Sequence, residues 1–175
     1  RTTEGPIRLY AVQGDIVNVL LGESSIEFVN GPDGSIVPTG SYTAPAQPVW
    51  VRAGEDIVNF GTGTVSGGFN PSMFINREAT DVSLVEAGGS IFNLSVQIGG
   101  PGTLEVSAGG EIYQGNVGTI TSMGPLVEGD GRSGASVAVM AGMANGIGWD
   151  AIRTAYLDPA NLADPERPLA DPLNA

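Results

Sequence analysis

The chain has 175 residues, and its seven Lys plus Arg residues against 19 Asp plus Glu residues give a formal net charge of −12 at pH 7. This charge opposes contact with a nucleic-acid backbone or an anionic membrane surface, and no stretch approaches the roughly 18 apolar residues of a spanning helix, so we expect neither a nucleic-acid partner nor a transmembrane segment. Without Lys, His or Cys, the chain cannot form a Ser-His-Asp or Cys-His triad, a thiolate or imidazole zinc site, a disulfide, a Schiff base or a P-loop.

A motif of valine, glycine, isoleucine and an amide recurs along the chain. Each copy has the pattern of a short strand, a glycine corner and a second short strand, a unit too small to bury itself alone. Stacking such units in one direction buries a continuous core, so the repeat predicts an all-β fold in which the chain coils as a parallel β-solenoid. The copies span residues 12–18, 51–59, 85–93 and 106–114, with a degenerate fifth copy at 139–143.

Short strand-like stretches accompany the repeats from the N-terminus onward. Several alternate apolar and polar residues and are bounded by Gly, Pro, Asn or Ser, which favours strands with one face inward. These stretches span residues 7–10, 26–29, 49–51, 82–85, 104–106 and 137–139. The matched isoleucines Ile16, Ile57, Ile91 and Ile112 are separated by 41, 34 and 21 residues. The last spacing is about one solenoid turn, and we expect each longer gap to hold about two turns.

Two stretches interrupt this pattern. Residues 31–48 hold four prolines and many small polar residues, and residues 61–71 are rich in glycine and end in Asn70-Pro71. Such compositions are typical of loops. We therefore assign residues 1–145 to a β-solenoid segment with loop excursions near 31–48 and 61–71.

The spacing of apolar residues changes again beyond residue 146. Trp149, Ile152 and Tyr156 fall at helical spacing, and Asp150 is a reasonable N-cap. This pattern predicts a short helix that ends before Pro159, followed by an irregular tail punctuated by Asp-Pro pairs. We assign residues 146–175 to a helical cap and a Pro-rich polar tail, in which the aromatic side chains can cover the open end of the solenoid.

Four amides lie two residues beyond the matched isoleucines. If the coils stack in register, these side chains can form a ladder along the axis, each bonded to the next. The alternative is that they are simply residues that favour turns. The amides are Asn18, Asn59, Asn93 and Gln114.

Paired carboxylates are the one catalytic device that this composition permits, because two of them can cleave a glycosidic bond. The candidate pairs are Glu55 with Asp56 and Glu128 with Asp130. Adjacent strand residues point to opposite faces, and one phase of the repeat carries polar residues that fit a solvated outer column, so we predict no catalytic residue. The residues of this column are Asp15, Asp56, Ser90 and Glu111.

The acidic, glycine-rich composition of these repeats also makes calcium binding a possibility to test against the sequence. The glycine-rich calcium roll needs an aspartate two residues past its third glycine, where this chain has Leu104. Glu128 and Asp130 either bind an ion weakly or belong to a surface loop in which Arg132 supplies the counter-charge, and the second interpretation is favoured. We therefore predict no metal site and no cofactor. The Met, Phe and Tyr residues are expected in the core or in stacking contacts.

Three stretches taken together resemble a known family. They are GPGTLEVSAGGEIYQG at 100–115, GPLVEGDGRSGASVAVMAG at 124–142 and AYLDPAN at 155–161. In this order they resemble a domain of unassigned function near the C-terminal part of very large filamentous-haemagglutinin-like exoproteins of Gram-negative bacteria. The resemblance covers most of the chain from about residue 49 onward. It implies a right-handed parallel β-helix, export by two-partner secretion, and display on or release from the cell surface for adhesion or biofilm formation.

These observations lead to one functional prediction and two alternatives. We predict a fragment of a large secreted or surface-displayed adhesin that is not an enzyme and that binds a cell-surface or matrix glycan or protein by avidity. One alternative is a glycan-active or glycan-binding β-helix module, whose active form requires two carboxylates about 5–9.5 Å apart. The other is a self-assembling structural fibre segment, because solenoid ends are natural stacking surfaces. Since a repeat already runs from residue 12 and the first residue is not Met, we expect a piece of a longer polypeptide.

Overall fold

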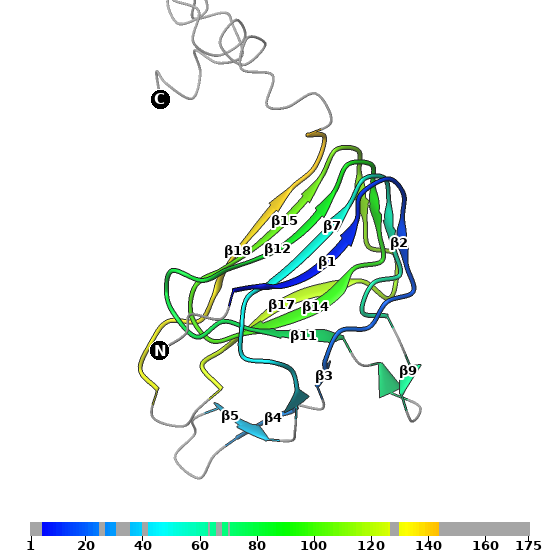
Figure 1. The fold of residues 1–175 in the computed structure, drawn as a ribbon. Helices are drawn as coiled ribbons and strands as arrows, with labels where there is room; N and C mark the ends of the chain where they lie inside the picture. The colour runs from blue at the N-terminus through cyan, green and yellow to red at the C-terminus, as the bar shows by residue number, and fades with distance from the viewer. Residues whose placement is uncertain are drawn as a thin grey trace, which may run out of the picture. The chain divides into compact units, whose positions relative to one another are not determined.

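The structure is a computed structural model that describes residues 5–24, 27–30, 36–39, 42–62, 64–65, 68–69, 71–126 and 130–143. By its internal contacts the chain divides into two units, and all of these residues belong to the first, Arg1–Ala144. Every regular element in these ranges is a β-strand (Figure 1). The predicted all-β class is confirmed for this part of the chain. The helix and polar tail expected at 146–175 lie outside the described residues.

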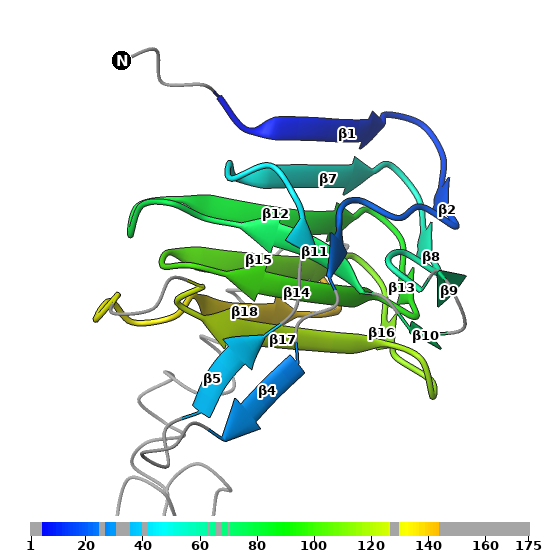
Figure 2. The same cartoon turned by 90° about the horizontal axis from the view of Figure 1, so that it is seen from below.

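The largest sheet, here called the first sheet, has five strands that follow one another in chain order and are all parallel. Figure 2 shows this stack from β1 at one end to β18 at the other. Parallel neighbours require long connections, and here each connection passes through one or both of the other parallel sheets before it returns. The strands are β1 (Ile7–Ala11), β7 (Val49–Ala53), β12 (Val82–Ala87), β15 (Thr103–Ala108) and β18 (Ser136–Met140).

Two further parallel sheets lie in the connections between the strands of the first sheet. The second sheet consists of two-residue strands, β2 (Ile16–Val17), β8 (Ile57–Val58), β13 (Ile91–Phe92) and β16 (Ile112–Tyr113). The third sheet contains β11 (Ser72–Ile75), β14 (Ser95–Gly99) and β17 (Thr119–Gly124). Successive circuits pair in register, so that the matched isoleucines lie directly over one another. This arrangement is consistent with a β-helix-like fold.

The remaining strands lie outside the three parallel sheets and pair antiparallel. Three short pairs occur in the connections that follow β2 and β8 (Figure 1). They account for the longer repeat spacings, because β1 pairs directly with β7, and β7 pairs directly with β12. The expectation of two turns in each longer gap is therefore wrong, since each gap holds one turn plus an excursion. The pairs are β3 (Glu23–Ser24) with β6 (Tyr42–Thr43), β4 (Glu27–Asn30) with β5 (Ile36–Thr39), and β9 (Thr64–Val65) with β10 (Gly68–Phe69).

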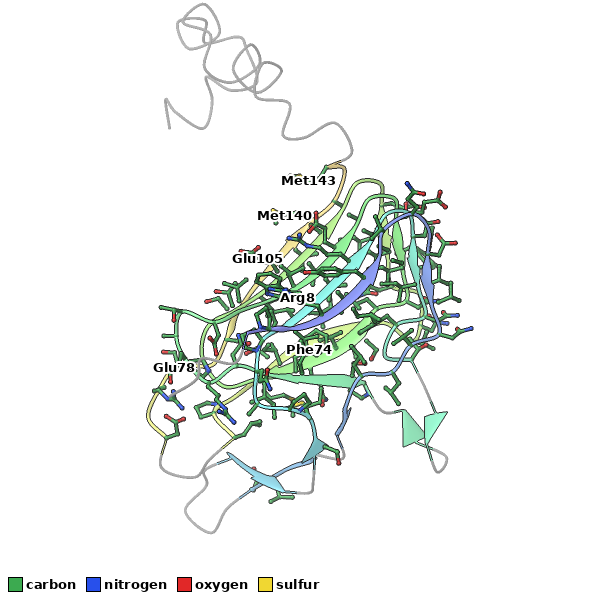
Figure 3. All side chains as sticks on the ribbon, viewed as in Figure 1. Arg8, Phe74, Glu78, Glu105, Met140 and Met143 are labelled. Atoms are coloured by element: carbon green, nitrogen blue, oxygen red, sulfur yellow. The ribbon has the colours of Figure 1, made fainter. Side chains whose placement is uncertain are left out.

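The core lies between the sheets and is built by period-two alternation along the strands. In β12 the side chains of Ser83, Val85 and Ala87 are buried, whereas Glu86 is exposed. Phe74, which is labelled in Figure 3, is fully buried. It meets the fully buried Phe60 edge to face, with ring centroids 6.3 Å apart. Complete burial of one large apolar side chain contributes on the order of 1.5–3 kcal/mol, so each residue of the stacked inward columns adds to the stability of the fold.

The first repeat copy begins at a different residue from the one expected. Leu9, not Val12, pairs with Val51, and Ala11 pairs with Ala53. The corner between Ala11 and Ile16 is one residue longer than the corresponding corner before Ile57. Because of this extra residue, Val12 points into solvent with 82% of its side chain exposed.

Candidate functional site

The outer side of the first sheet carries a group of neighbouring aromatic and charged side chains. We call it the first-sheet outer face. In one row Arg8 lies opposite Trp50, and in the next row Tyr10 lies opposite Arg52. These positions alternate with inward residues such as Leu9 and Val51, so the pleat directs them away from the core. The face consists of Arg8, Tyr10, Trp50, Arg52, Glu86 and Glu105.

Arg52 is the centre of this face. Its guanidinium carbon lies 5.8 Å from the ring centroid of Trp50 and 6.0 Å from that of Tyr10, within the range of cation–π attraction. Its Nε also lies 2.9 Å from Oε2 of Glu86, which is the residue opposite it on β12. Three neighbours therefore position one planar group on the sheet surface.

Trp50 is held from two further directions. Its indole Nε1 donates a hydrogen bond to the carbonyl oxygen of Val82, at 2.8 Å, and the guanidinium of Arg8 lies 5.4 Å from its ring centroid. With its N–H satisfied inside the protein, Trp50 can offer a partner only its ring surface. The ring thus serves as a fixed apolar platform between cationic groups.

The exposure and charge of this face define what it can contact. Tyr10 is 44% exposed, and the side chains of Arg52 and Glu86 are each about half exposed. An exposed ion pair of this kind adds little to the stability of the fold. Guanidinium, carboxylate and phenol groups beside an aromatic platform can together hydrogen-bond and stack on a polar ring such as a sugar.

Sequence reasoning missed this face, although a signal for it was present. The segments IRLYA and VWVRA place an aromatic residue and an arginine two residues apart on the side opposite the apolar residues. The assignment of Met, Phe and Tyr residues to core or stacking positions holds for the buried Phe74 and Met73. Tyr113 and Met140, in contrast, are exposed.

In the candidate carboxylate pair Glu55 and Asp56, Asp56 is hydrogen-bonded to the backbone and side chain of neighbouring coils. Asp56 Oδ1 accepts a hydrogen bond from the backbone N–H of Ser90 at 2.7 Å, and its own N–H donates to Asp15 Oδ1 at 2.9 Å. Ser90 Oγ in turn accepts from the N–H of Glu111 at 3.1 Å. The predicted polar column is confirmed, and its role is to satisfy backbone N–H groups at the corners between successive coils.

Only one member of the second candidate pair, Glu128 and Asp130, lies in the described part of the chain. Glu128 lies outside the described residues, and Asp130 forms a multiple contact with Arg132, whose Nε and Nη2 donate to its carboxylate at 2.8–3.1 Å. Hydrogen bonds from the side chain and then the backbone of Arg132 lower the pKa of Asp130 below 3.8, and the same contact raises the pKa of Arg132. Arg132 is therefore the counter-charge that the sequence indicated. No cluster of three or more acidic residues suited to a metal ion occurs in the described part of the chain.

The amide ladder exists for three of its four predicted members. Asn93 Nδ2 donates to Asn59 Oδ1 at 2.9 Å, and Asn59 Nδ2 donates to Asn18 Oδ1 at 3.1 Å. Gln114 departs from the ladder because its Oε1 accepts the backbone N–H of Leu94 instead. The ladder stabilises the corner between the second sheet and the following segment, and we assign it no binding role.

Comparison with known proteins adds no relative to these observations. No family model, no curated protein and no solved structure matches the chain. Across residues 5–143, so far as they are described, no helix has the length and apolar character needed to cross a bilayer. The first-sheet outer face and the resemblance of the three sequence stretches are therefore the two features of this chain that bear on its function.

Proposed function

We propose that this chain is a right-handed parallel β-helix segment of a secreted or surface-displayed bacterial adhesin, and that it binds its partner through the first-sheet outer face. The observation that carries the proposal is the cluster of the exposed Tyr10 and Arg52 with the half-buried Trp50, held together on the outer side of a parallel sheet. Rigid aromatic and arginine side chains are the residues most often found at the centre of binding surfaces.

The β-helix part of the proposal is supported by the in-register parallel pairing of the sheets. Strands of adjacent coils lie about 4.8 Å apart, so a coiled chain presents its outward side chains as rows. A partner with its own repeat, such as a surface or matrix glycan, can engage several rows at once and gain affinity by avidity. A glycan or a protein displayed on a cell surface is the partner class that we propose.

Binding without turnover is supported by the engagement of the acidic side chains. Asp15 and Asp56 accept backbone hydrogen bonds, and Asp130 is paired with Arg132. These three carboxylates therefore already have structural partners within the folded chain. The first-sheet outer face also fits the glycan-binding alternative, in which its aromatic rings stack on sugar rings. Export by two-partner secretion follows from the resemblance alone and belongs to the same proposal.

The test is a binding measurement with matched surface variants. The purified chain is applied to immobilised mammalian cell-surface glycans, matrix glycans and matrix proteins, and bound protein is measured against concentration. We expect saturable binding that falls at least tenfold in the double variant Arg8→Ala, Tyr10→Ala. Tyr113→Ala is the control, because Tyr113 is an exposed tyrosine on the second sheet, and it should leave binding unchanged.

Two results would contradict the proposal. One is the absence of saturable binding to every immobilised class. The other is an equal loss in the Tyr113→Ala control, which would place the interaction away from the first sheet. Melting curves of all variants establish that each remains folded, so that a loss of binding is not a loss of structure.

A further inference from the structure

The strand β18 leaves apolar side chains in solvent at one end of the first sheet. Val137 and Val139 continue the inward columns of Leu104 and Val106, with which they pair. Leu104 and Val106 are fully buried, whereas Val137 is 40% and Val139 is 52% exposed. No described strand pairs with the outer edge of β18. An uncovered edge with apolar side chains is a template for a further strand.

The opposite end of the sheet has the complementary form. Strand β1 is the other edge, and no described strand pairs with its outer side. Its inward residues Ile7 and Leu9 are only partly buried. Placed beside β18 in the same direction, β1 of a second copy would continue the column in which Leu9, Val51, Val85, Val106 and Val139 follow one another.

The charges along the first-sheet outer face differ between its two ends. Arg8 and Arg52 lie on the strands at the β1 end, whereas Glu86 and Glu105 lie on β12 and β15, toward the β18 end. Figure 3 shows Arg8, Glu105 and Met140 along this sheet. Two β1 edges brought together would oppose arginine to arginine, whereas β18 against β1 brings opposite charges together. Charge complementarity therefore selects the head-to-tail pairing.

We propose that β18 of one copy pairs in parallel and in register with β1 of a second copy, which joins their first sheets into one. In this register Arg8 of the second copy lies opposite Ala138, whose small side chain leaves space for the Arg8 guanidinium to turn away from the Trp50 ring and reach Glu105 on the next strand. The backbones of β1 in the second copy and β15 in the first copy are then about 10 Å apart, which is two strand spacings. Tyr10 of the second copy lies opposite the exposed Met140, a favourable sulfur–aromatic contact.

This contact is heterologous, because different surfaces of the two copies meet. Each copy keeps one free edge after pairing, so the contact does not close on itself and can extend to further copies. The inference goes beyond the proposed function and does not depend on it. A chain that binds a glycan as a monomer would retain the proposed function and overturn this inference.

Sedimentation velocity of the full 175-residue chain over a range of concentrations tests the contact. We expect association that strengthens with concentration and weakens with salt, because Arg8 and Glu105 contribute across the contact. Val139→Lys places a charge on the inward side of β18, away from the first-sheet outer face, and should weaken association at least tenfold. The already high exposure of Val139 makes this variant compatible with folding.

Charge reversal provides a second and independent measurement. Arg8→Glu should weaken association at least fivefold, and the double variant Arg8→Glu, Glu105→Arg should restore it. Arg77→Glu is the control, because Arg77 is exposed in the segment that follows β11 and the substitution changes the net charge by the same amount. It should have no effect beyond that of net charge.

The inference is overturned if the chain stays monomeric at all concentrations, which would indicate that β18 is covered by residues of its own chain. It is also overturned if the chain associates but responds equally to Arg8→Glu and Arg77→Glu. Restoration by the double charge swap distinguishes a direct contact from a folding defect, since a destabilised chain would not recover with a second reversal.

Discussion

The side-chain amide of Asn59 donates a hydrogen bond to the Oδ1 of Asn18, 3.1 Å away, although 41 residues separate them in the chain. Asn59 Oδ1 also accepts from Asn93, so Asn59 is the middle member of the ladder. All three asparagines have positive φ, between 53° and 57°. Asparagine is the non-glycine residue that best tolerates this conformation. Each side chain therefore meets two requirements at once, a left-handed corner and a bond to the next coil.

Substitution of Asn59 separates these two requirements. Asn59→Ala loses two side-chain hydrogen bonds and places an alanine at positive φ, so we expect a loss of about 2–3 kcal/mol in the free energy of unfolding. Asn59→Gly loses the same bonds but accepts the conformation, and its loss should be about 0.5–1 kcal/mol smaller. Urea denaturation of both variants measures the difference. Equal losses would show that the backbone conformation carries no cost.

The isoleucine column predicts a cavity effect at the centre of the second sheet. Ile91 is fully buried and pairs with Ile57 on one side and Ile112 on the other. Ile91→Ala should lower the free energy of unfolding by about 2–5 kcal/mol, and Ile91→Asp should prevent cooperative folding because it buries a charge. Val12→Ala is the control and should change stability by less than about 0.5 kcal/mol, since Val12 is exposed. Thermal melts that match for Ile91→Ala and Val12→Ala would contradict the assignment of the core.

The sequence was informative wherever a local pattern decides the structure. Period-two alternation predicted the first-sheet strands, and the shared phase of Asp15 and Asp56 predicted that they would stack. Both follow from side-chain periodicity alone. Two features could not be predicted this way. Whether the residues between Ile16 and Ile57 form a second turn or an excursion depends on which strands pair, and the extra residue in the corner after Ala11 shifts the first repeat without changing its composition.

The candidate site shows the same division between local and distant information. The alternation in IRLYA and VWVRA places Arg8 and Trp50 on outward faces, which a local pattern can indicate. Their mutual contact depends on the register between β1 and β7, which are joined by a long connection that contains antiparallel strands. A shift of that register by one residue would turn every side chain of β1 to the other face. The cluster is therefore a property of the coil, and a linear pattern cannot specify it.

Two glycines with the same backbone conformation provide a test of close packing. Gly61 and Gly124 have φ of 72° and 75°. A Cβ on Gly61 would collide with the backbone oxygen of Ser95, whereas a Cβ on Gly124 would meet nothing within 4 Å. Gly124→Ala should cost about 1–2 kcal/mol for the conformation alone, and Gly61→Ala should cost about 1–3 kcal/mol more because of the collision. Guanidinium denaturation compares them, and similar losses would exclude close contact between the coils at Gly61.

The pairing of Asp130 with Arg132 predicts a local dependence on pH. Its folded-state pKa lies below 3.8, so the contact stabilises the folded loop at pH values above 3.8 and loses its effect as the pH falls through the lowered value. Titration of the carboxyl carbon of Asp130 by NMR should give a midpoint below 3.8, and Arg132→Gln should raise that midpoint because the donors of the guanidinium are gone. Arg77→Gln is the control, because only its backbone oxygen contacts Arg132, and it should leave the midpoint unchanged. A midpoint insensitive to Arg132→Gln would show that the two side chains are not paired in solution, and Asp130 would then be free to meet a cation.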